Sequence, residues 1–354
     1  MEKTDVLIVG QGLSGTWLSW WLQQAGMSFK IIDHQNPDSA SNRAAGLINP
    51  VTGRRIVTTW MINELMPFAV SAYTAMGEFL NEALIDQTSV IDFFPSVQML
   101  QAFQKRFEED PAYLLPGEDR EKYAEWFRYD LGWGAIHPCW LVKVEILLNV
   151  WRSWLEKNNG ILEETFELSK LNEANDEIEY SGIHASYIVF CDGSSSAQNP
   201  YFNRLPFALN KGEALMVEIK ALPPGLIFKK GMSLVPYAEN IFWLGSSYEW
   251  TFENNQPSES FRKNAESWLI HNLKMPYRIL EHFAAVRPAT LERRPFVGFH
   301  PLHPRIGLLN GMGTKGCSLA PYFAKQLVDN LKGDGLIHPL ADIRRFEKIL
   351  TRQL

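Results

Sequence analysis

Cysteine is scarce in this 354-residue chain, because Cys139, Cys191 and Cys317 are its only thiols and none lies in a CxxC or zinc-ligand spacing. This scarcity excludes a disulfide framework and fits the reducing conditions of the cytoplasm, where we expect the protein. Long hydrophobic runs are missing too, since residues 6–9 and 17–22 fall far short of the roughly 20 apolar residues of a membrane-spanning helix. We therefore expect neither a signal peptide nor a membrane anchor.

An excess of positive charge is also lacking, because 34 Lys and Arg face 40 Asp and Glu, for a net charge of −6 and a pI near 5.8. This balance disfavours nucleic acid as a partner. The GxSxG, HExxH and GxxxxGKS/T motifs are absent, which excludes the esterases, zinc proteases and P-loop enzymes that depend on them. The histidines are scattered, and His300 and His303 lie in a proline-rich loop, so we expect no metal site.

The start of the chain does contain a βαβ pattern. Residues 6–9 are a β-branched apolar run that predicts a buried strand, residues 16–25 have apolar side chains at helical spacing, and residues 29–32 predict a second strand. A right-handed crossover makes such strands parallel neighbours. The unit predicts a nucleotide-binding domain of the α/β class.

A glycine-rich turn, Gly10-x-Gly12-x-x-Gly15, joins the first strand to its helix. Gly10 permits a tight turn, Gly12 lets the backbone approach a pyrophosphate, and Gly15 lets the helix pack closely on the strand. Asp33 lies 23 residues after Gly10, where a carboxylate can accept hydrogen bonds from both ribose hydroxyls. A chance glycine loop is the alternative, but strand, helix and acid together predict a dinucleotide site.

A second glycine-rich turn, residues 311–316, lies near the other end of the chain, between a predicted strand at 306–309 and a predicted helix at 318–331. The helix N-terminus would offer N–H groups and a positive dipole end to an electron-rich group such as a reduced flavin. An ordinary turn before a helix is the alternative. Nicotinamide enzymes usually complete the cofactor domain before the catalytic one, so motifs at both ends of the chain favour a flavin.

Motifs along nearly the whole chain resemble those of one family. They are residues 10–15 with Asp33, 41–47, 191–193, 286–290 and 311–321, and they look like the motifs of the FAD-dependent D-amino acid oxidase family. This family includes glycine oxidase, sarcosine oxidase and the flavin domain of the bifunctional tRNA modification protein that makes 5-methylaminomethyl-2-thiouridine. The resemblance implies FAD, bound non-covalently because residues 282–286, near which some members attach flavin, contain no cysteine.

The resemblance also implies a reaction and a set of cofactor contacts. A neutral amine loses hydride from carbon to flavin N5, water hydrolyses the resulting imine, and oxygen commonly accepts the electrons. The residues expected to contact FAD are Gly10, Gly12, Leu13, Ser14, Gly15, Asp33, His34, Arg43, Ala44, Ala45, Gly46, Asp192, Gly193, Gly311, Gly313, Thr314, Lys315, Gly316 and Cys317.

Four residues are candidates for catalytic or substrate contacts. In the family, the arginine of an Arg-Pro pair binds the substrate carboxylate, which suggests Arg287; a structural ion pair is the alternative. Tyr237 and Tyr248 flank a predicted strand where family members build the pocket roof, although buried tyrosines often satisfy a backbone carbonyl instead. Arg55 follows the 41–47 segment and could face the flavin or lie in a surface loop.

We expect a Rossmann-like FAD-binding domain of the glutathione-reductase type with an inserted, strand-rich α+β substrate domain. The predicted FAD-binding domain comprises residues 1–84, 135–205 and 284–354, and the substrate domain comprises 85–134 and 206–283. Further helices are expected near 61–84, 140–157 and 258–273, a hairpin at 162–182, and strands at 187–190, 214–219, 233–235 and 241–244.

The leading hypothesis is an FAD-dependent oxidoreductase that oxidises the C–N bond of a small amine or amino acid. One alternative is oxidative removal of a carboxymethyl group from a modified tRNA wobble uridine; the acidic balance and the lack of an attached methyltransferase domain stand against it. The other is a flavin-binding protein without amine oxidase activity. The sequence leaves the amine, the electron acceptor and the oligomeric state open.

Overall fold

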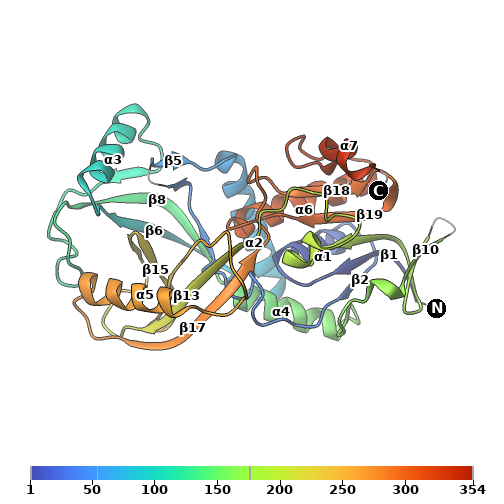
Figure 1. Cartoon of the computed structure of the whole chain (residues 1–354), viewed down its shortest axis with the longest axis horizontal. Helices are drawn as coiled ribbons and strands as arrows, with labels where there is room; N and C mark the ends of the chain where they lie inside the picture. Colours follow the sequence, from blue (N-terminus) through green and yellow to red (C-terminus); the bar gives the residue numbers. More distant parts are fainter. Residues whose placement is uncertain (1, 54, 175–176, 353–354) are drawn as a thin grey trace.

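The computed structural model describes residues 2–53, 55–174 and 177–352 and has two lobes along its long axis (Figure 1). The first lobe, on the right in Figure 1, is built on an eight-stranded sheet, and the second lobe on a nine-stranded sheet. The chain passes between the lobes several times, so each lobe is assembled from segments that are far apart in sequence. This is the mixed α/β architecture that the sequence predicts.

Parallel strands form the centre of the first-lobe sheet, in the order β9-β2-β1-β12-β19. Antiparallel strands extend it, because β11 pairs with the start of β12 and β18 pairs with β19. The strands are β1 (Glu2–Val9), β2 (Phe29–Ile32), β9 (Ile161–Leu162), β10 (Leu171–Ala174), β11 (Glu177–Tyr180), β12 (Ile183–Phe190), β18 (Phe296–His300) and β19 (His303–Asn310).

Helices cover both faces of this sheet. Trp17, Trp151 and Phe323 are buried together on one face, where Trp21 Nε1 also donates to the Pro321 carbonyl oxygen at 2.8 Å. The helices on this face are α1 (Leu13–Gln24), α2 (Ile62–Leu80), α4 (Val144–Lys157) and α6 (Gly316–Lys332). The opposite face of the sheet packs against α7 (Glu347–Leu350) and the 3-10 helix Ile343–Phe346. Two further 3-10 helices are Leu168–Lys170 and Gly193–Ala197.

The second-lobe sheet runs in the order β17-β13-β16-β15-β14-β6-β8-β3, with β7 also paired to β8. Its strands are β3 (Leu47–Ile48), β6 (Ile85–Phe93), β7 (Leu114–Pro116), β8 (Trp133–Val142), β13 (Asn210–Glu218), β14 (Ile227–Lys230), β15 (Met232–Ala238), β16 (Ile241–Gly245) and β17 (Arg278–Arg287). The helices are α3 (Val97–Glu109) and α5 (Glu259–Asn272), and β4 (Val51–Thr52) and β5 (Val57–Thr58) form a separate hairpin.

Side chains of β13 alternate between two cores, as strand geometry requires. Leu215 and Val217 pack with Phe261 of α5, whereas Ala214 and Met216 face the other side of the sheet. The face that bears Ala214 is the one that contributes to the cavity described below.

One predicted helix begins later than expected, because strand pairing in the second lobe takes up its first residues. The helix expected at 140–157 begins at Val144, since Trp140 and Leu141 belong to β8 and pair with β6 and β3. The predicted FAD-binding segment 135–205 therefore starts inside a strand of the second sheet. Its segment 284–354 likewise starts inside β17, which pairs with β13.

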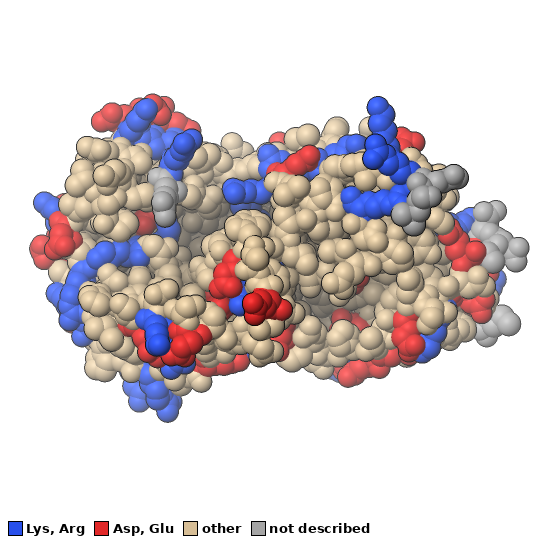
Figure 2. Space-filling model, viewed as in Figure 1, with Lys and Arg blue, Asp and Glu red and all other residues tan. Residues whose placement is uncertain are grey.

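Charge is mixed on the face of Figure 2, where basic and acidic side chains are interspersed over both lobes. Within the part of the chain that the structure describes, no helix is long and apolar enough to cross a membrane. Nor do three or more His, Cys, Asp or Glu side chains of these residues gather as the ligands of a metal ion would.

Candidate active site

A cavity of about 1170 Å³ is lined by residues of both lobes. Its first-lobe wall is formed by the loops that follow the carboxyl ends of β1, β2, β12 and β19. β1 lies between β2 and β12 in the sheet, and the chain leaves β1 toward β2. The loops after β1 and β12 therefore diverge at a switch point, which is where open α/β sheets bind ligands. The second-lobe wall is one face of the antiparallel sheet.

The turn after β1 has the geometry that a dinucleotide requires. Gly10 has a φ of +95°, and a Cβ at this residue would lie 2.8 Å from the Cys191 carbonyl oxygen. A Cβ at Gly15 would lie 1.9 Å from the Gly10 carbonyl oxygen, so Gly15 packs helix against strand and is not among the lining residues. Gly12, Leu13 and Ser14 line the cavity and leave the start of α1 open to it.

Asp33 follows β2 and is held in place by three donors. Gln11 N donates to Asp33 Oδ1 at 2.9 Å, and Gln35 N donates to Oδ2 at 2.8 Å. Arg152 of α4 donates from Nη1 to Asp33 Oδ2 at 2.9 Å and to Gln11 Oε1 at 3.1 Å. Arg152 is 5% exposed and lines the cavity together with Asp33 and His34. Asp33 Oδ1 keeps a lone pair for a ribose hydroxyl.

The loop after β12 carries Asp192 and Gly193, and both line the cavity. Ser196 Oγ donates to the Asp192 carboxylate, and burial raises the pKa of Asp192 to about 6. Asn310, the last residue of β19, donates from Nδ2 to the Gly193 carbonyl oxygen and to Ser196 Oγ, each at 2.8 Å. The ends of two parallel strands are thus joined at the cavity wall.

The 41–47 segment lines the cavity mainly with backbone and small side chains. Arg43 is engaged in ion pairs with Asp38 at 2.9 Å and Glu281 at 2.8 Å. Ser41 Oγ accepts a hydrogen bond from Leu13 N at 3.0 Å, which fixes this segment against the start of α1. The lining residues of the segment are Ser41, Asn42, Arg43, Ala44, Ala45, Gly46 and Leu47.

The turn before α6 also faces the cavity, except for its first glycine. Gly311 has a φ of +78° and is not among the lining residues. It packs against Thr290 instead, because a Cβ at Gly311 would lie 2.8 Å from Thr290 Cγ2. Burial and the nearby charges of Arg294 and Arg293 lower the pKa of Lys315, the N-cap residue of α6. The lining residues of the turn are Met312, Gly313, Thr314, Lys315, Gly316 and Cys317.

Arg287, at the end of β17, presents its guanidinium on the second-lobe wall. Its Nη1 donates to Asn210 Oδ1 at 2.7 Å and to the Ser247 carbonyl oxygen at 3.2 Å. The group lies directly over Gly212, where a Cβ would be 1.8 Å from Nη2. The Tyr248 ring centroid lies 4.9 Å from Arg287 Cζ. Burial lowers the pKa of Arg287, and no carboxylate of the described residues pairs with it.

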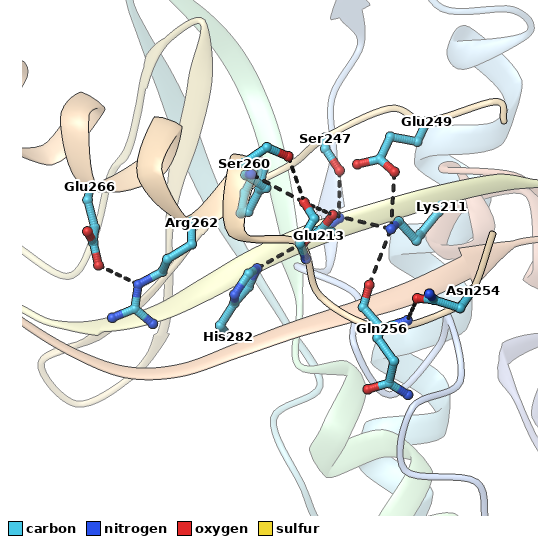
Figure 3. Close-up of polar contacts among 12 residues, drawn as sticks. Lys211, Glu213, Ser247, Glu249, Asn254, Gln256, Ser260, Arg262, Glu266 and His282 are labelled. Carbon is cyan, nitrogen blue, oxygen red and sulfur yellow. Dashed lines mark hydrogen bonds and ion pairs between the residues drawn. The ribbon is translucent and has the colours of Figure 1, made fainter. Parts of the chain in front are cut away.

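A buried carboxylate behind β13 fixes the loop that carries Ser247 and Tyr248 (Figure 3). Glu213 is fully buried, and its two oxygens accept from Ser258 N at 2.6 Å and Ser258 Oγ at 2.7 Å. Its backbone N donates to Ser247 Oγ at 3.0 Å. Burial alone would raise the pKa of Glu213, but the hydrogen bonds from Ser258 and the charge of Lys211 lower it. The loop is thus anchored on the face opposite the cavity.

The other candidate substrate contacts lie differently. Tyr248 lines the cavity and is 59% exposed. Tyr237 is not among the lining residues, because its hydroxyl donates to Glu145 Oε2 of α4 at 2.8 Å. Arg55 is exposed and also outside the lining, although Gly53 of the same hairpin belongs to it. Of the four candidates, the structure brings Arg287 and Tyr248 together.

A dinucleotide turn that faces a separate lobe, with an arginine on its wall that meets no carboxylate among the described residues, defines a two-lobed, dinucleotide-dependent enzyme. The chain belongs to the DAO family of FAD-dependent oxidoreductases, whose family model matches residues 5–330. Its fold is similar to glycine oxidase from Geobacillus kaustophilus, with a TM-score of 0.79, 18% identity and 100% of both chains covered. It is also similar to glycine oxidase from Bacillus cereus (TM-score 0.80, 16% identity, 99% of each chain). Iminodiacetate oxidase from a Chelativorans species has a TM-score of 0.74 and 17% identity, over 96% of this chain and 98% of that one.

The cofactor is therefore FAD, and the residues present fit it. The turn at Gly12, with Ser41 Oγ beside it, faces the cavity where a pyrophosphate would bind, Asp33 is placed for a ribose, and the N-terminus of α6 with Lys315 for an electron-rich ring edge. Gln11 and Ser41 lie within the motifs 10–15 and 41–47 but are not among the expected contacts, and no motif predicts Arg152 or Gly212 as residues of this site. Gly212 carried a signal, because a glycine inside a strand often marks close approach of another group; nothing local marked Arg152.

Proposed function

We propose that this protein oxidises the C–N bond of a small amino acid whose carboxylate binds Arg287. The observation that supports this most is a guanidinium on the cavity wall with neutral partners, Asn210 Oδ1 and the Ser247 carbonyl oxygen. A partly desolvated cation is stabilised by an incoming anion, and the planar fork of arginine matches a carboxylate in two places.

The surroundings of Arg287 favour one orientation of such a substrate. Asn210 and Gly212 hold the guanidinium flat on the second-lobe sheet, and Tyr248 stacks on it and limits contact with water. Pro288, the residue after Arg287, accepts a hydrogen bond from Gly313 N at 3.1 Å, so a carboxylate bound to Arg287 lies close to the turn before α6. The amine is thereby placed between Arg287 and the first-lobe residues that hold FAD.

Bound FAD supplies the redox chemistry by accepting a hydride from the carbon that carries the amine nitrogen. The amine nitrogen also loses a proton, so the substrate becomes an imine, which water hydrolyses to a carbonyl compound and an amine or ammonia. We propose molecular oxygen as the final two-electron acceptor, with hydrogen peroxide as its product. Since the neutral amine reacts, the chain needs no dedicated catalytic base.

The test is the anaerobic addition of D-amino acids, N-methyl amino acids and simple amines to the FAD-loaded protein. The flavin absorbance is measured, and a substrate should decrease it. With the best substrate, Arg287→Ala should raise KM by roughly 30-fold or more while FAD remains bound, because truncation costs about 2 to 5 kcal/mol of binding. Arg287→Lys should raise KM by about tenfold, since charge remains but the fork is lost. Arg278→Ala, on the exposed start of the same strand, is the matched control.

Two results would contradict the proposal. Unchanged KM in Arg287→Ala would show that the substrate lacks a carboxylate or binds it elsewhere, which favours a simple amine or a modified tRNA nucleoside as substrate. A flavin that none of the compounds bleaches would favour a protein that binds FAD without amine oxidase activity.

A further inference from the structure

A single strip of the second-lobe sheet extends from the Arg287 site across the cavity wall. Strand pairing aligns Ala214 of β13 with Gly245 of β16, Gly245 with Ser233 of β15, and Ser233 with Lys229 of β14. Paired residues of neighbouring strands project to the same face. All four line the same cavity as Arg287, so they form one continuous wall.

The middle of this strip carries small residues, and the Trp243 ring of the adjacent row leans over Gly245, where an added Cβ would lie 2.7 Å from Trp243 Cη2 and 3.0 Å from Cζ3. Ala214, Gly245 and Ser233 are small, and Gly231 beside them also lines the cavity. The adjacent row on the same face is filled with large apolar side chains that close the sheet beyond the strip. That row comprises Met216, Trp243, Val235 and Ile227. Trp243 and Val235 of this row line the cavity as well, so an extended ligand would pack against the Trp243 ring between the small side chains of Ala214 and Ser233.

Lys229 ends the strip with hydrogen-bonding capacity to spare. Its Nζ donates to Asp92 Oδ2 at 2.6 Å, and within the described part of the chain this is its one hydrogen-bond acceptor. Asp92 is 2% exposed and lies on β6, the strand next to β14 on the side away from Arg287. An ammonium has three donors. Asp92 thus holds Lys229 from behind and leaves the remaining donors for a group in the cavity.

The strand geometry sets the length of a ligand that reaches both cations. Neighbouring strands are about 4.8 Å apart, so Ala214 and Lys229 are separated by about 14 Å across three strand spacings. Gly212, under the Arg287 guanidinium, lies two residues along β13 from Ala214, or about 7 Å, which puts it about 16 Å from Lys229. Asp92 draws the Lys229 ammonium toward β6, to this distance or a few Å beyond it, so after a hydrogen bond of about 3 Å at each end roughly 10 to 13 Å remains for the ligand.

We infer that the substrate is an elongated amino acid with a second oxygen acceptor, a carboxylate or a carboxamide, at its far end. Arg287 binds the α-carboxylate, the chain of the substrate lies against Ala214, the Trp243 ring and Ser233, and Lys229 donates to the distal oxygen. This inference rests on the proposed function, since it takes Arg287 as the α-carboxylate site. It adds Lys229 as the residue that determines substrate length and polarity.

The test compares three glycines that differ only at the end of an N-linked six-carbon chain: N-(5-carboxypentyl)glycine, its terminal amide, and N-hexylglycine. About eight bonds separate the two carboxyl carbons of the first compound, or roughly 10 Å when extended, which matches the strip. Binding is measured anaerobically from the change in flavin absorbance of the FAD-loaded protein. The carboxylate and the amide should bind about 10- to 100-fold more tightly than N-hexylglycine, as expected for a hydrogen bond to a charged donor.

Variants assign the effect to Lys229. Lys229→Met with Asp92→Asn removes the ammonium without leaving a buried unpaired carboxylate, and should make the three compounds bind equally, with N-hexylglycine unchanged. Lys230→Met is the matched control, because Lys230 lies next to Lys229, is not among the lining residues, and donates to the Arg128 carbonyl oxygen at 2.9 Å. If the double variant does not fold, the ligand comparison in the unmodified protein decides alone.

The outcomes separate this inference from the proposed function. Equal binding of the three compounds to the unmodified protein, with all three weakened by Arg287→Ala, would leave the proposed function standing and refute the role of Lys229. A preference for the polar ends that survives in the double variant would also refute it. If none of the three, nor any amine or amino acid of the panel, changes the flavin spectrum, the proposed function and this inference both fail.

Discussion

Replacing Gly212 by alanine should weaken substrate binding without harming the fold. A Cβ at Gly212 would lie 1.8 Å from Arg287 Nη2, 2.0 Å from Cζ and 2.3 Å from Nη1. These distances are far below van der Waals contact, so the guanidinium must move by about 1.5 Å or more. The φ of Gly212 is not positive, so its backbone accepts alanine without strain. The added Cβ clashes with the end of the Arg287 side chain, which can move.

The magnitude follows from what that movement breaks. Displacement of Arg287 loosens its 2.7 Å bond to Asn210 Oδ1 and moves the fork away from the substrate carboxylate. A misplacement of about 1 Å can cost roughly 100-fold in a positioned site, so we expect KM or kcat/KM to worsen by about 30- to 100-fold. Folding stability should stay the same or rise by about 0.5 kcal/mol, because alanine is less costly than glycine inside a strand.

The assay measures KM, kcat, bound FAD and Tm for Gly212→Ala beside Gly225→Ala, whose added Cβ would meet nothing within 4 Å. Only Gly212→Ala should lose substrate binding, and both should retain FAD. In the Arg287→Ala background, Gly212→Ala should have no further effect, since the group it displaces is already gone. Equal kinetics in the two glycine variants, or additive losses with Arg287→Ala, would refute the assignment.

Two further predictions concern cofactor attachment and acid stability. Acid precipitation should release the flavin into solution, since the thiols that line the cavity, Cys191 and Cys317, are buried with raised pKa values; flavin on the pellet would contradict this. His300 Nδ1 accepts from Leu302 N, and burial and nearby positive charge lower the pKa of His300 to about 4. Because the unfolded chain binds a proton near pH 6.5 and the folded chain does not, stability should fall by about 2 to 3 kcal/mol between pH 6.5 and 4. His300→Asn keeps an acceptor and should flatten this dependence in urea unfolding, whereas parallel slopes would exclude His300 as its source.

The first lobe could be predicted because its signals are local. The apolar run at 6–9, the glycines after it and the strand at 29–32 fall within one βαβ unit, and the structure pairs Val6 with Phe29 and Val9 with Ile32. The second glycine turn was found for the same reason, since strand, turn and helix are consecutive there. In such units, short-range periodicity decides the structure and tertiary contacts agree with it.

The second lobe could be predicted only in part because its contacts are distant in sequence. β13 and β17 pair across about 70 residues, so nothing near Arg287 indicates that Gly212 lies beneath it. Trp140 and Leu141 look like the first turn of an amphipathic helix, yet pairing of β8 with β6 and β3 makes them a strand. Long-range pairing of this kind outweighs intrinsic propensity.

Asp33 shows how a distant partner changes a locally derived prediction. The sequence predicts only that Asp33 accepts from a ribose, but the structure adds buried Arg152, 119 residues away, as its ion-pair partner at 2.9 Å. Asp33→Ala should therefore lower FAD affinity about 10- to 100-fold and also destabilise the apoprotein by about 1 to 2 kcal/mol, because Arg152 loses its 2.9 Å partner and keeps only the longer ion pairs with Glu156 at 3.4 Å and Glu163 at 3.5 Å. Asp38→Ala removes only an exposed ion pair with Arg43 and should change both quantities little. FAD titration and urea unfolding of the two apoproteins would measure these effects. Equal FAD affinity in the two variants would exclude Asp33 as the ribose acceptor, and an unchanged urea midpoint in Asp33→Ala would show that Arg152 does not depend on it.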